Sequence, residues 1–415
     1  MFKHTDIVTA VEIGSSKICV VTGEVTEDEP LRVIDFAEEP VDGEVVKGEI
    51  ADMDRVLEKL IAAFDRADTS KMLNKSRIFA MNISGCNIAS RQESAALFVD
   101  GKVSAADLQA AADAIEQKTL SGNLEKFNIA DSYYVLDDVR RVRNPIDQNA
   151  RKFELFSHVI FGDANRINNF RTAFIDAGFE EPPSLIFSGL ADLYAVVSQE
   201  EREHGALLVD VGRGTTEYIA IFNDGVFASG VIPVGFDHLA NDLSIGLNLP
   251  LDVCRGVFTG SLLQQPSAVN SGMVEVSGRR IPLASFEKII DLRLRELFTI
   301  VRNGFPDQSA LRNLASGGIL TGGGALFPRT AEIFHSMFDL PVRIGAPYDH
   351  EQDLGFLADP RYSSLWGSLC YAAELLKIAN LNRKRGMFTS IFGALGNMGD
   401  SARRTITDLK DSIKL

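Results

Sequence analysis

Hydrophobic and polar positions along the chain form two similar units, each an apolar run, a glycine turn and a second apolar run. Ile7 to Ile13 and Ile18 to Val25 flank the first turn, and Leu207 to Val211 and Tyr218 to Phe222 flank the second. These runs are rich in β-branched residues, so each unit predicts a β-hairpin. A plain hairpin with a glycine turn remains the alternative for either unit alone.

Both turns have the composition of a phosphate-binding loop. Glycine allows the backbone to approach a ligand closely, while hydroxyl groups and a lysine add hydrogen-bond donors. An acid precedes each turn, Glu12 in the first and Asp210 in the second, and such carboxylates suit a hydrated Mg²⁺ ion that bridges phosphates. The residues predicted to hold the phosphates are Gly14, Ser15, Ser16, Lys17, Gly212, Arg213, Gly214, Thr215 and Thr216.

A third glycine segment follows near the end of the chain. Gly322, Gly323 and Gly324 come after an apolar run and before a segment that predicts a helix. Successive glycines allow a flat ligand, such as a base with its ribose, to lie against the main chain. Two matching turns and this segment predict a duplicated domain whose halves close on one ligand, with amides of Gly14, Gly212 and the triple glycine lining the gap.

The remaining pattern predicts an alternation of helices and strands. Residues 53–67 have the apolar spacing of an amphipathic helix, and 104–120 begin at Ser104, a good helix N-cap. Further helices are expected at 164–179 and 283–305, and further strands at 77–85, 94–101, 133–145 and 152–162.

Composition limits the class of protein. With 415 residues, 45% of them hydrophobic and 24% charged, the chain is expected to be globular, with two or more domains. No run reaches the ~18 apolar residues that span a bilayer, so we expect a cytoplasmic protein. The four cysteines lie far apart, which favours buried free thiols. A net charge of -15 argues against nucleic acid as a partner.

The last residues differ from the rest because basic side chains outnumber acidic ones after residue 381. Apolar residues recur there at one-turn intervals, which predicts an amphipathic helix lying in the plane of an anionic membrane surface. The alternative is that this stripe packs on the body of the protein. The residues predicted to contact the membrane are Arg383, Lys384, Arg385, Met387, Phe388, Ile391, Phe392 and Leu395.

Several longer segments carry a resemblance to a known family. They are "GEVVKGEIADMDRV", "NISGCNIAS", "NPIDQNARKFELFSHVI", "IPVGFDHLANDL" and "LPVRIGAPYDHEQDLGFLADPRYSSLWGSLCYA". Together with the three glycine segments they resemble the FtsA family of bacterial division proteins, within the actin, Hsp70 and sugar-kinase superfamily. The resemblance implies ATP and Mg²⁺ as cofactors and an α/β, actin-like (ribonuclease H-like) fold of two duplicated lobes with a small mixed α/β insert.

The resemblance also implies a division of the chain into domains. A first core domain is expected at 1–79 and 161–200, with the small FtsA-type domain inserted at 80–160. The second core domain is expected at 201–240 and 315–380, with a helical insert at 241–314, and a basic amphipathic tail at 381–415.

By the same resemblance the chain is expected to polymerise on the inner face of the cell membrane at the division septum and to anchor the tubulin-like protein FtsZ there. Its expected partners are FtsZ, further copies of itself and the anionic membrane surface. The alternatives are a PilM-like pilus-assembly scaffold and a small-molecule kinase of the superfamily.

Some residues depart from the family pattern. The family usually has Asp where this chain has Glu12 and Glu217, and Gly where it has Arg213. Because these positions lie on the phosphate loops, we expect ATP to bind and its hydrolysis to be slow or lost, so that the chain is at most a slow ATPase. Asp252 and Arg255 have the three-residue offset of a pair that the family often places beside the base and ribose, although the spacing to the downstream glycine is one residue longer. A solvated helix face is the alternative for these two residues.

Overall fold

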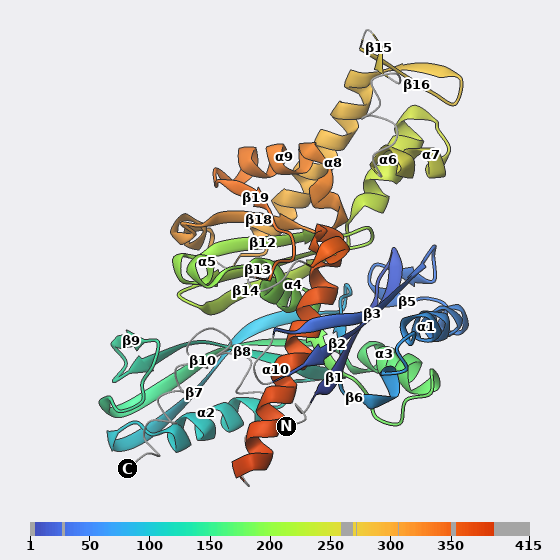
Figure 1. Cartoon of the computed structure of the whole chain (residues 1–415). Helices are drawn as coiled ribbons and strands as arrows, with labels where there is room; N and C mark the ends of the chain where they lie inside the picture. Colours follow the sequence, from blue (N-terminus) through green and yellow to red (C-terminus); the bar gives the residue numbers. More distant parts are fainter. Residues whose placement is uncertain are drawn as a thin grey trace.

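The structure is a computed structural model of the 415-residue chain. It describes residues 5–26, 30–258, 269–270, 272–305, 307–349 and 354–385. Figure 1 shows an upper and a lower lobe with the helix α10 passing in front of them, and a further domain extending from the lower lobe.

The first lobe is built on a twisted sheet with the strand order β11-β6-β1-β2-β3. β1 pairs antiparallel with β2 and parallel with β6, and β6 pairs parallel with β11. Almost every residue of β1 and β2 is buried, which fits their β-branched composition. The strands are β1 (Asp6–Ile13), β2 (Lys17–Val25), β3 (Arg32–Pro40), β6 (Ser76–Ile83) and β11 (Ser184–Phe187).

The second lobe repeats this arrangement in the order β14-β13-β12-β18-β19. β12 pairs antiparallel with β13 and parallel with β18, and β18 pairs parallel with β19. Each lobe therefore has the same meander followed by parallel strands, and the predicted duplicated, actin-like fold is confirmed. The strands are β12 (Ala206–Val211), β13 (Thr216–Phe222), β14 (Gly225–Ile232), β18 (Gly317–Thr321) and β19 (Val342–Ile344).

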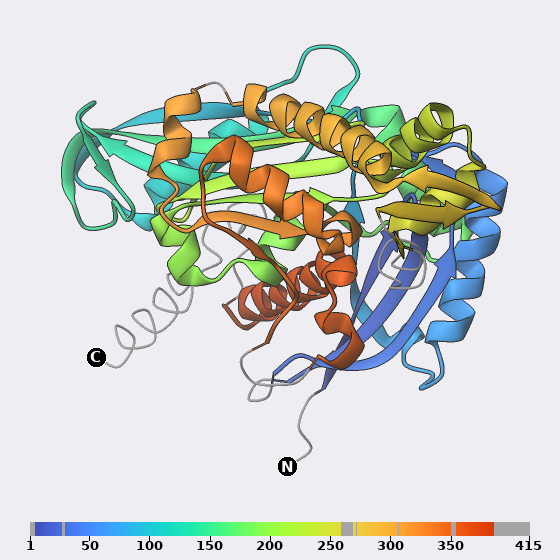
Figure 2. The same cartoon turned by 90° about the horizontal axis from the view of Figure 1, so that it is seen from above.

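Helices cover both faces of the first sheet (Figure 2). α1 (Met53–Ala67) packs on β2 and β3, and α10 (Ser363–Arg385) packs on β1, β2 and β6. α1 has the predicted bounds, and the Asp52 side chain caps it by accepting a hydrogen bond from the Arg55 amide at 3.1 Å. α10 also contacts α4 (Ser188–Val196), so these two helices pack where the lobes join.

A small domain is inserted in the first lobe. Its sheet has the order β7-β10-β8-β9, and α2 (Ala105–Gln117) packs on β7 and β10. Ser104 is the N-cap of α2, as predicted, and it also forms a capping box with Asp107. α3 (Ala164–Asp176) then returns the chain to the first lobe. The strands are β7 (Ala89–Lys102), β8 (Leu124–Leu136), β9 (Arg140–Val142) and β10 (Asn149–Asp163).

The second lobe carries an insert that was expected to be helical. The structure adds a small antiparallel sheet of β15, β16 and β17, which the sequence pattern did not predict because these strands have only two to four residues each. The elements of this region are α6 (Phe236–Leu247), α7 (Leu251–Phe258), β15 (Val269–Asn270), β16 (Met273–Val276), β17 (Arg279–Pro282), α8 (Leu283–Asn303) and α9 (Pro328–Phe338).

Short elements complete the described chain. They are β4 (Val45–Val46), β5 (Glu49–Ile50), α5 (Gln199–His204), η1 (Leu73–Lys75), η2 (Gln308–Asn313), η3 (Gly323–Leu326), η4 (Gly355–Ala358) and η5 (Pro360–Tyr362).

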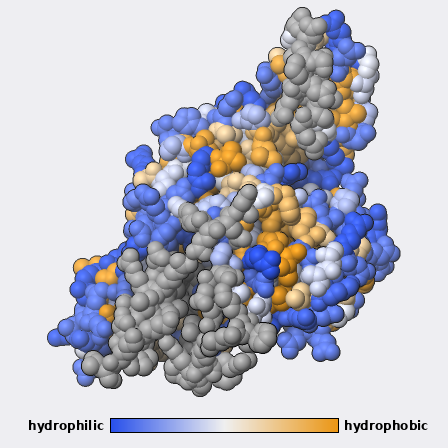
Figure 3. Space-filling view, in the orientation of Figure 1, coloured by the Kyte–Doolittle hydropathy of each residue, from blue (hydrophilic) through white to orange (hydrophobic). Residues whose placement is uncertain are grey.

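Hydrophobic atoms gather on the face drawn in Figure 3, in the region of β3. Phe356 of η4 is 54% exposed, and its ring centre lies 4.7 Å from that of Phe36 on β3. Tyr362 completes this aromatic group, with its ring centre 5.6 Å from that of Phe36.

Candidate functional site

The two predicted turns have the same local geometry. The Gly14 amide donates to the Lys17 carbonyl at 2.9 Å, and the Gly212 amide donates to the Thr215 carbonyl at 2.9 Å. These bonds close the turns, so the expectation that the Gly14 and Gly212 amides line a ligand gap is corrected. Amides at the tips of the turns remain the candidates to face a phosphate.

The turns of the two lobes touch each other. A Cβ atom added to Gly214 would come within 2.5 Å of Ser15 Oγ, so only glycine permits this approach. Ser15 Oγ also accepts a hydrogen bond from the Gly48 amide at 3.3 Å, and Thr215 Oγ1 lies 3.4 Å from Ser84 Oγ. The turns, nearly two hundred residues apart in sequence, therefore meet at one point between the lobes.

The third glycine segment reaches the same point. Gly322 has a φ of 78°, and a Cβ atom on it would overlap Asp210 Oδ1. Gly323 faces the Arg361 side chain, whereas Gly324 lies against the Phe236 ring. Packing alone thus accounts for glycine at position 324, and Gly322 is the member of the segment that adjoins the second turn.

A group of acids lies where the three segments meet, with Asp192 and Glu217 buried and Glu12 and Asp210 half-buried. Glu12, Asp210 and Glu217 come from the hairpins, and Asp192 comes from α4. Burial raises the pKa of each of these carboxyl groups, and the charges of Glu217 and Glu12 help to raise the pKa of Asp210 to about 8. Mutual repulsion therefore disfavours full ionisation of the group.

Several oxygens of this group are buried without a hydrogen-bond partner. They are Glu12 Oε2, Asp210 Oδ1 and both carboxylate oxygens of Asp192. Buried polar atoms are almost always paired, so these oxygens fit a cation, ordered water or a proton between them. Among the described residues, no three His, Cys, Asp or Glu side chains are arranged as a direct metal site. The donor set suits a metal ion held through water.

Sequence analysis did not identify Asp192 or Ser84 as site residues. Ser84 donates a hydrogen bond to Glu217, and Asp192 is fully buried beside Asp210. A single acid within the apolar run "SGLADLYAVV" was the available signal for Asp192. Ser84 carries no such signal because only the fold brings it to the second turn.

The Lys17 and Arg213 side chains both bind protein groups in this structure. Lys17 Nζ donates to the Arg361 carbonyl and lies 4.2 Å from the centre of the Tyr362 ring. Arg213 donates to Asp237 and Asp42, and to the Val41 carbonyl at 2.9 Å. The expectation that Arg213 adds a free cation beside the phosphates is therefore corrected for this conformation.

The two residues of the expected ribose pair have different surroundings. Arg255 joins Arg213 on Asp237 and Asp42, at 3.0 Å and 3.2 Å. Asp252 is exposed in the first turn of α7.

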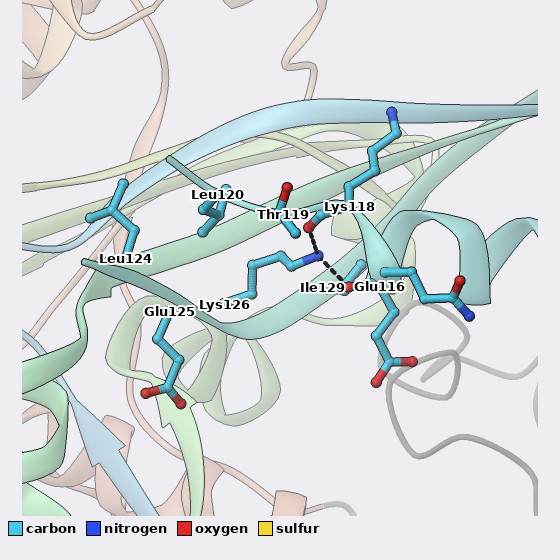
Figure 4. A pocket seen from close by; sticks show the side chains of 9 residues that line it. Glu116, Lys118, Thr119, Leu120, Leu124, Glu125, Lys126 and Ile129 are labelled. Atoms are coloured by element: carbon cyan, nitrogen blue, oxygen red, sulfur yellow. Dashed lines mark hydrogen bonds between the residues drawn. The ribbon is translucent and has the colours of Figure 1, made fainter. Parts of the chain in front are cut away.

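A surface pocket of about 460 Å³ lies in the inserted domain, away from these residues (Figure 4). Lys126 on β8 extends its ammonium group to the end of α2, where it donates to the carbonyls of Ile115 at 2.8 Å and Lys118 at 2.6 Å, and also to that of Glu116. Because this cation binds the exposed carbonyls of a helix C-terminus, its role is a helix cap.

The residues predicted to contact a membrane lie at and beyond the end of α10. Arg383, Lys384 and Arg385 are its last residues, so this helix continues past the end expected near residue 379. Met387, Phe388, Ile391, Phe392 and Leu395 lie outside the described residues. Within the described part of the chain, no helix is long and apolar enough to cross a membrane.

Comparison with solved structures defines the class of protein. The fold is similar to the PilM-PilN type IV pilus biogenesis complex, with a TM-score of 0.62, 16% identity and coverage of 88% of this chain and 98% of that one. It is also similar to MreB5 of Spiroplasma citri bound to ADP, with a TM-score of 0.51, 14% identity and coverage of 92% and 99%. The chain therefore has an actin-like fold of two lobes.

Sequence comparison finds similar proteins. The model of cell division protein FtsA matches residues 207–367. Cell division protein FtsA of Borreliella burgdorferi is 26% identical (91% of this chain, 94% of the relative), that of Pseudomonas aeruginosa is 27% identical (94% and 93%) and that of Escherichia coli K12 is 26% identical (90% and 92%). Over most of its length the chain is therefore similar to cell division proteins FtsA.

Proposed function

We propose that this chain is an ATP-binding division scaffold that polymerises on the inner face of the cell membrane at the division site and tethers FtsZ there. The observation that carries the proposal is the junction between the lobes, where two matching turns and Gly322 surround acids with buried, unpartnered oxygens. A ligand held there would bind residues from both lobes at once.

The proposed ligand is ATP with Mg²⁺. Glu12 and Asp210 would hold the ion through water, since magnesium keeps several waters and prefers oxygen ligands. When bound, the ion would neutralise phosphate charge that the acids alone would repel. The hydroxyl groups of Ser15, Ser16 and Thr215 would add donors from the two turns.

Slow hydrolysis is part of the proposal. Glu12 carries one methylene more than the Asp that is usual in the family, which would displace a metal-bound water. Glu217 accepts a hydrogen bond from Ser84, which holds its carboxylate at the second turn. In a phosphate-release assay we expect little turnover by the wild type and more by Glu12→Asp; brisk turnover by the wild type that is unchanged or reduced in Glu12→Asp contradicts this part.

The basic end of α10 supports membrane attachment. Arg383 to Arg385 stand at the helix C-terminus, and the sequence after them has the apolar spacing of an in-plane helix. Each cation near an anionic surface contributes about 1 kcal/mol, so binding by one copy would be modest and binding by a polymer strong. FtsZ as partner rests on the family relationship.

Truncation after Arg385 tests the proposed attachment, because it leaves α10 intact. We expect the full chain to pellet with vesicles that contain phosphatidylglycerol and to carry FtsZ with it, whereas the truncated chain and FtsZ remain in the supernatant. Phosphatidylcholine vesicles are the lipid control. Equal pelleting of the full and truncated chains contradicts the anchor, and a full chain that pellets without FtsZ contradicts the tether.

A further inference from the structure

We propose that Arg213 and Arg255, called here the arginine pair, form a phosphate-binding subsite at the junction of the lobes, and that Asp42 of the first lobe occupies this subsite in the present structure. This inference rests on the proposed nucleotide function. The phosphate is either the terminal group of a bound nucleotide or free inorganic phosphate.

Asp237 holds the arginine pair in place from one side. The Nε atoms of Arg213 and Arg255 each lie 3.0 Å from Asp237 Oδ1, and the Arg213 Nε also lies 3.0 Å from Oδ2. Asp237 lies in the first turn of α6, and its amide donates to the Arg213 carbonyl at 2.9 Å. Both guanidinium groups are therefore oriented by one helix terminus of the second lobe.

The other side of the arginine pair converges on one oxygen. Arg213 Nη2 lies 2.9 Å and Arg255 Nη1 lies 3.2 Å from Asp42 Oδ1. Two guanidinium groups around a single anionic oxygen can bind a carboxylate or a phosphate. In the proposed subsite a phosphate oxygen would take the place of Asp42 Oδ1.

Asp42 is suited to be displaced. Its side chain is 75% exposed, whereas those of Arg213 and Arg255 are 23% and 35% exposed. An ion pair with a partner this exposed contributes about 1 kcal/mol or less to the stability of the folded chain. After its release, the Asp42 carboxylate would be hydrated. A phosphate dianion carries more charge than the carboxylate that it would replace.

The subsite adjoins the first phosphate turn. The amide of Val41, the residue before Asp42, donates to the Ser16 carbonyl at 3.0 Å. Arg213 itself lies between Gly212 and Gly214 of the second turn. A phosphate on the arginine pair would therefore release the link that Asp42 makes from the first lobe to the second.

Binding of inorganic phosphate to the full chain tests the inference, measured by calorimetry at constant ionic strength. In Asp42→Asn the competing charge is gone, so we expect phosphate to bind about five-fold more tightly than to the wild type. Arg255→Gln added to Asp42→Asn should remove this gain. The matched control is Asp242→Asn, because Arg293 binds Asp242 through Nε at 2.6 Å and Nη2 at 2.9 Å within the second lobe.

The inference is overturned if Asp42→Asn binds inorganic phosphate no more tightly than Asp242→Asn does. It is also overturned if the higher phosphate affinity of Asp42→Asn remains after Arg255→Gln is added. Two further arms distinguish the sources of phosphate. If Asp42→Asn binds ATP more tightly than the wild type does, but not ADP, the phosphate is the terminal group of the nucleotide. If its affinity for ATP is unchanged and it binds inorganic phosphate more tightly in the presence of saturating ADP, the phosphate is free phosphate. A chain that binds no nucleotide refutes the proposed function, while the phosphate comparison still decides the subsite.

Discussion

Gly322 is the residue on which the contact between the third glycine segment and Asp210 depends. Its φ of 78° and ψ of 174° lie in a region that is essentially restricted to glycine and costs other residues about 1–3 kcal/mol, and a Cβ atom there would overlap the Asp210 carboxylate. We expect Gly322→Ala to lower the free energy of unfolding by about 3 kcal/mol, because overpacking adds about 1–3 kcal/mol to the backbone cost. We also expect this variant to bind nucleotide more weakly. Urea unfolding and nucleotide titration measure the two effects.

Gly122 provides the matched control. It has the same φ of 78°, and an added Cβ atom would meet nothing within 4 Å. Gly122→Ala should therefore cost only the backbone part, about 1–2 kcal/mol, and leave nucleotide binding unchanged. If both variants lose the same free energy of unfolding, the close approach of Gly322 to Asp210 is contradicted.

His158 makes the protein sensitive to acid. It is buried where β10 faces β14, with Nε2 2.8 Å from Ser229 Oγ, and burial lowers its pKa to about 4. Above pH 6.5 the residue is neutral in both states. Between pH 6.5 and 4 only the unfolded chain takes up the proton, so stability falls by about 3 kcal/mol.

Unfolding of His158→Gln as a function of pH measures this contribution. Between pH 6.5 and 4 the free energy of unfolding of the variant should fall by about 3 kcal/mol less than that of the wild type, because glutamine cannot be protonated at this position in the unfolded chain. His204→Gln, at an exposed position, should follow the wild type. A pH profile of His158→Gln parallel to that of the wild type rules out the assigned contribution.

At the scale of single residues, the sequence identified the acids of the turns but not their surroundings. Glu12 and Asp210 stand at a fixed distance from a glycine turn, which is a local pattern. Asp192 and Ser84 reach the same place only through tertiary packing. The direction of the Arg213 side chain likewise depends on Asp42 and Asp237, which are distant in sequence.

At the scale of elements, Lys126 stabilises the end of α2 and with it the inserted domain. Its ammonium group donates to the carbonyls of Ile115 and Lys118. Lys126→Met keeps most of the apolar stem and removes these bonds, so we expect the free energy of unfolding to fall by about 1–2 kcal/mol. Chemical denaturation followed by circular dichroism checks the change.

Lys102→Met is the control for this prediction. Lys102 lies 3.8 Å from Asp147, and both side chains are mostly exposed, so its loss should change stability by less than about 0.5 kcal/mol. A Lys126→Met variant as stable as Lys102→Met excludes a capping role for Lys126.

Most long elements could be predicted because periodicity and caps are local signals. The bounds of α1 and the N-cap of α2 match the sequence pattern. The strands β15 to β17 were missed because such short runs have no measurable alternation. The end of α10 was placed too early, since its last residues are polar and give no apolar spacing.

At the scale of the whole molecule, the duplication could be predicted from two similar turns, and the structure extends it to the order and direction of all strands in both sheets. The contacts that join the lobes could not be predicted. They involve Ser15 with Gly214 and Asp42 with the arginine pair, each between residues more than one hundred positions apart.

We propose that the junction between the lobes holds one ATP with Mg²⁺. Isothermal titration of the full chain with ATP, in the presence and absence of Mg²⁺, tests this proposal. We expect saturable binding of one nucleotide per chain, stronger with Mg²⁺ and weakened in Asp210→Asn. Absence of saturable binding with Mg²⁺, or binding that Asp210→Asn leaves unchanged, contradicts it.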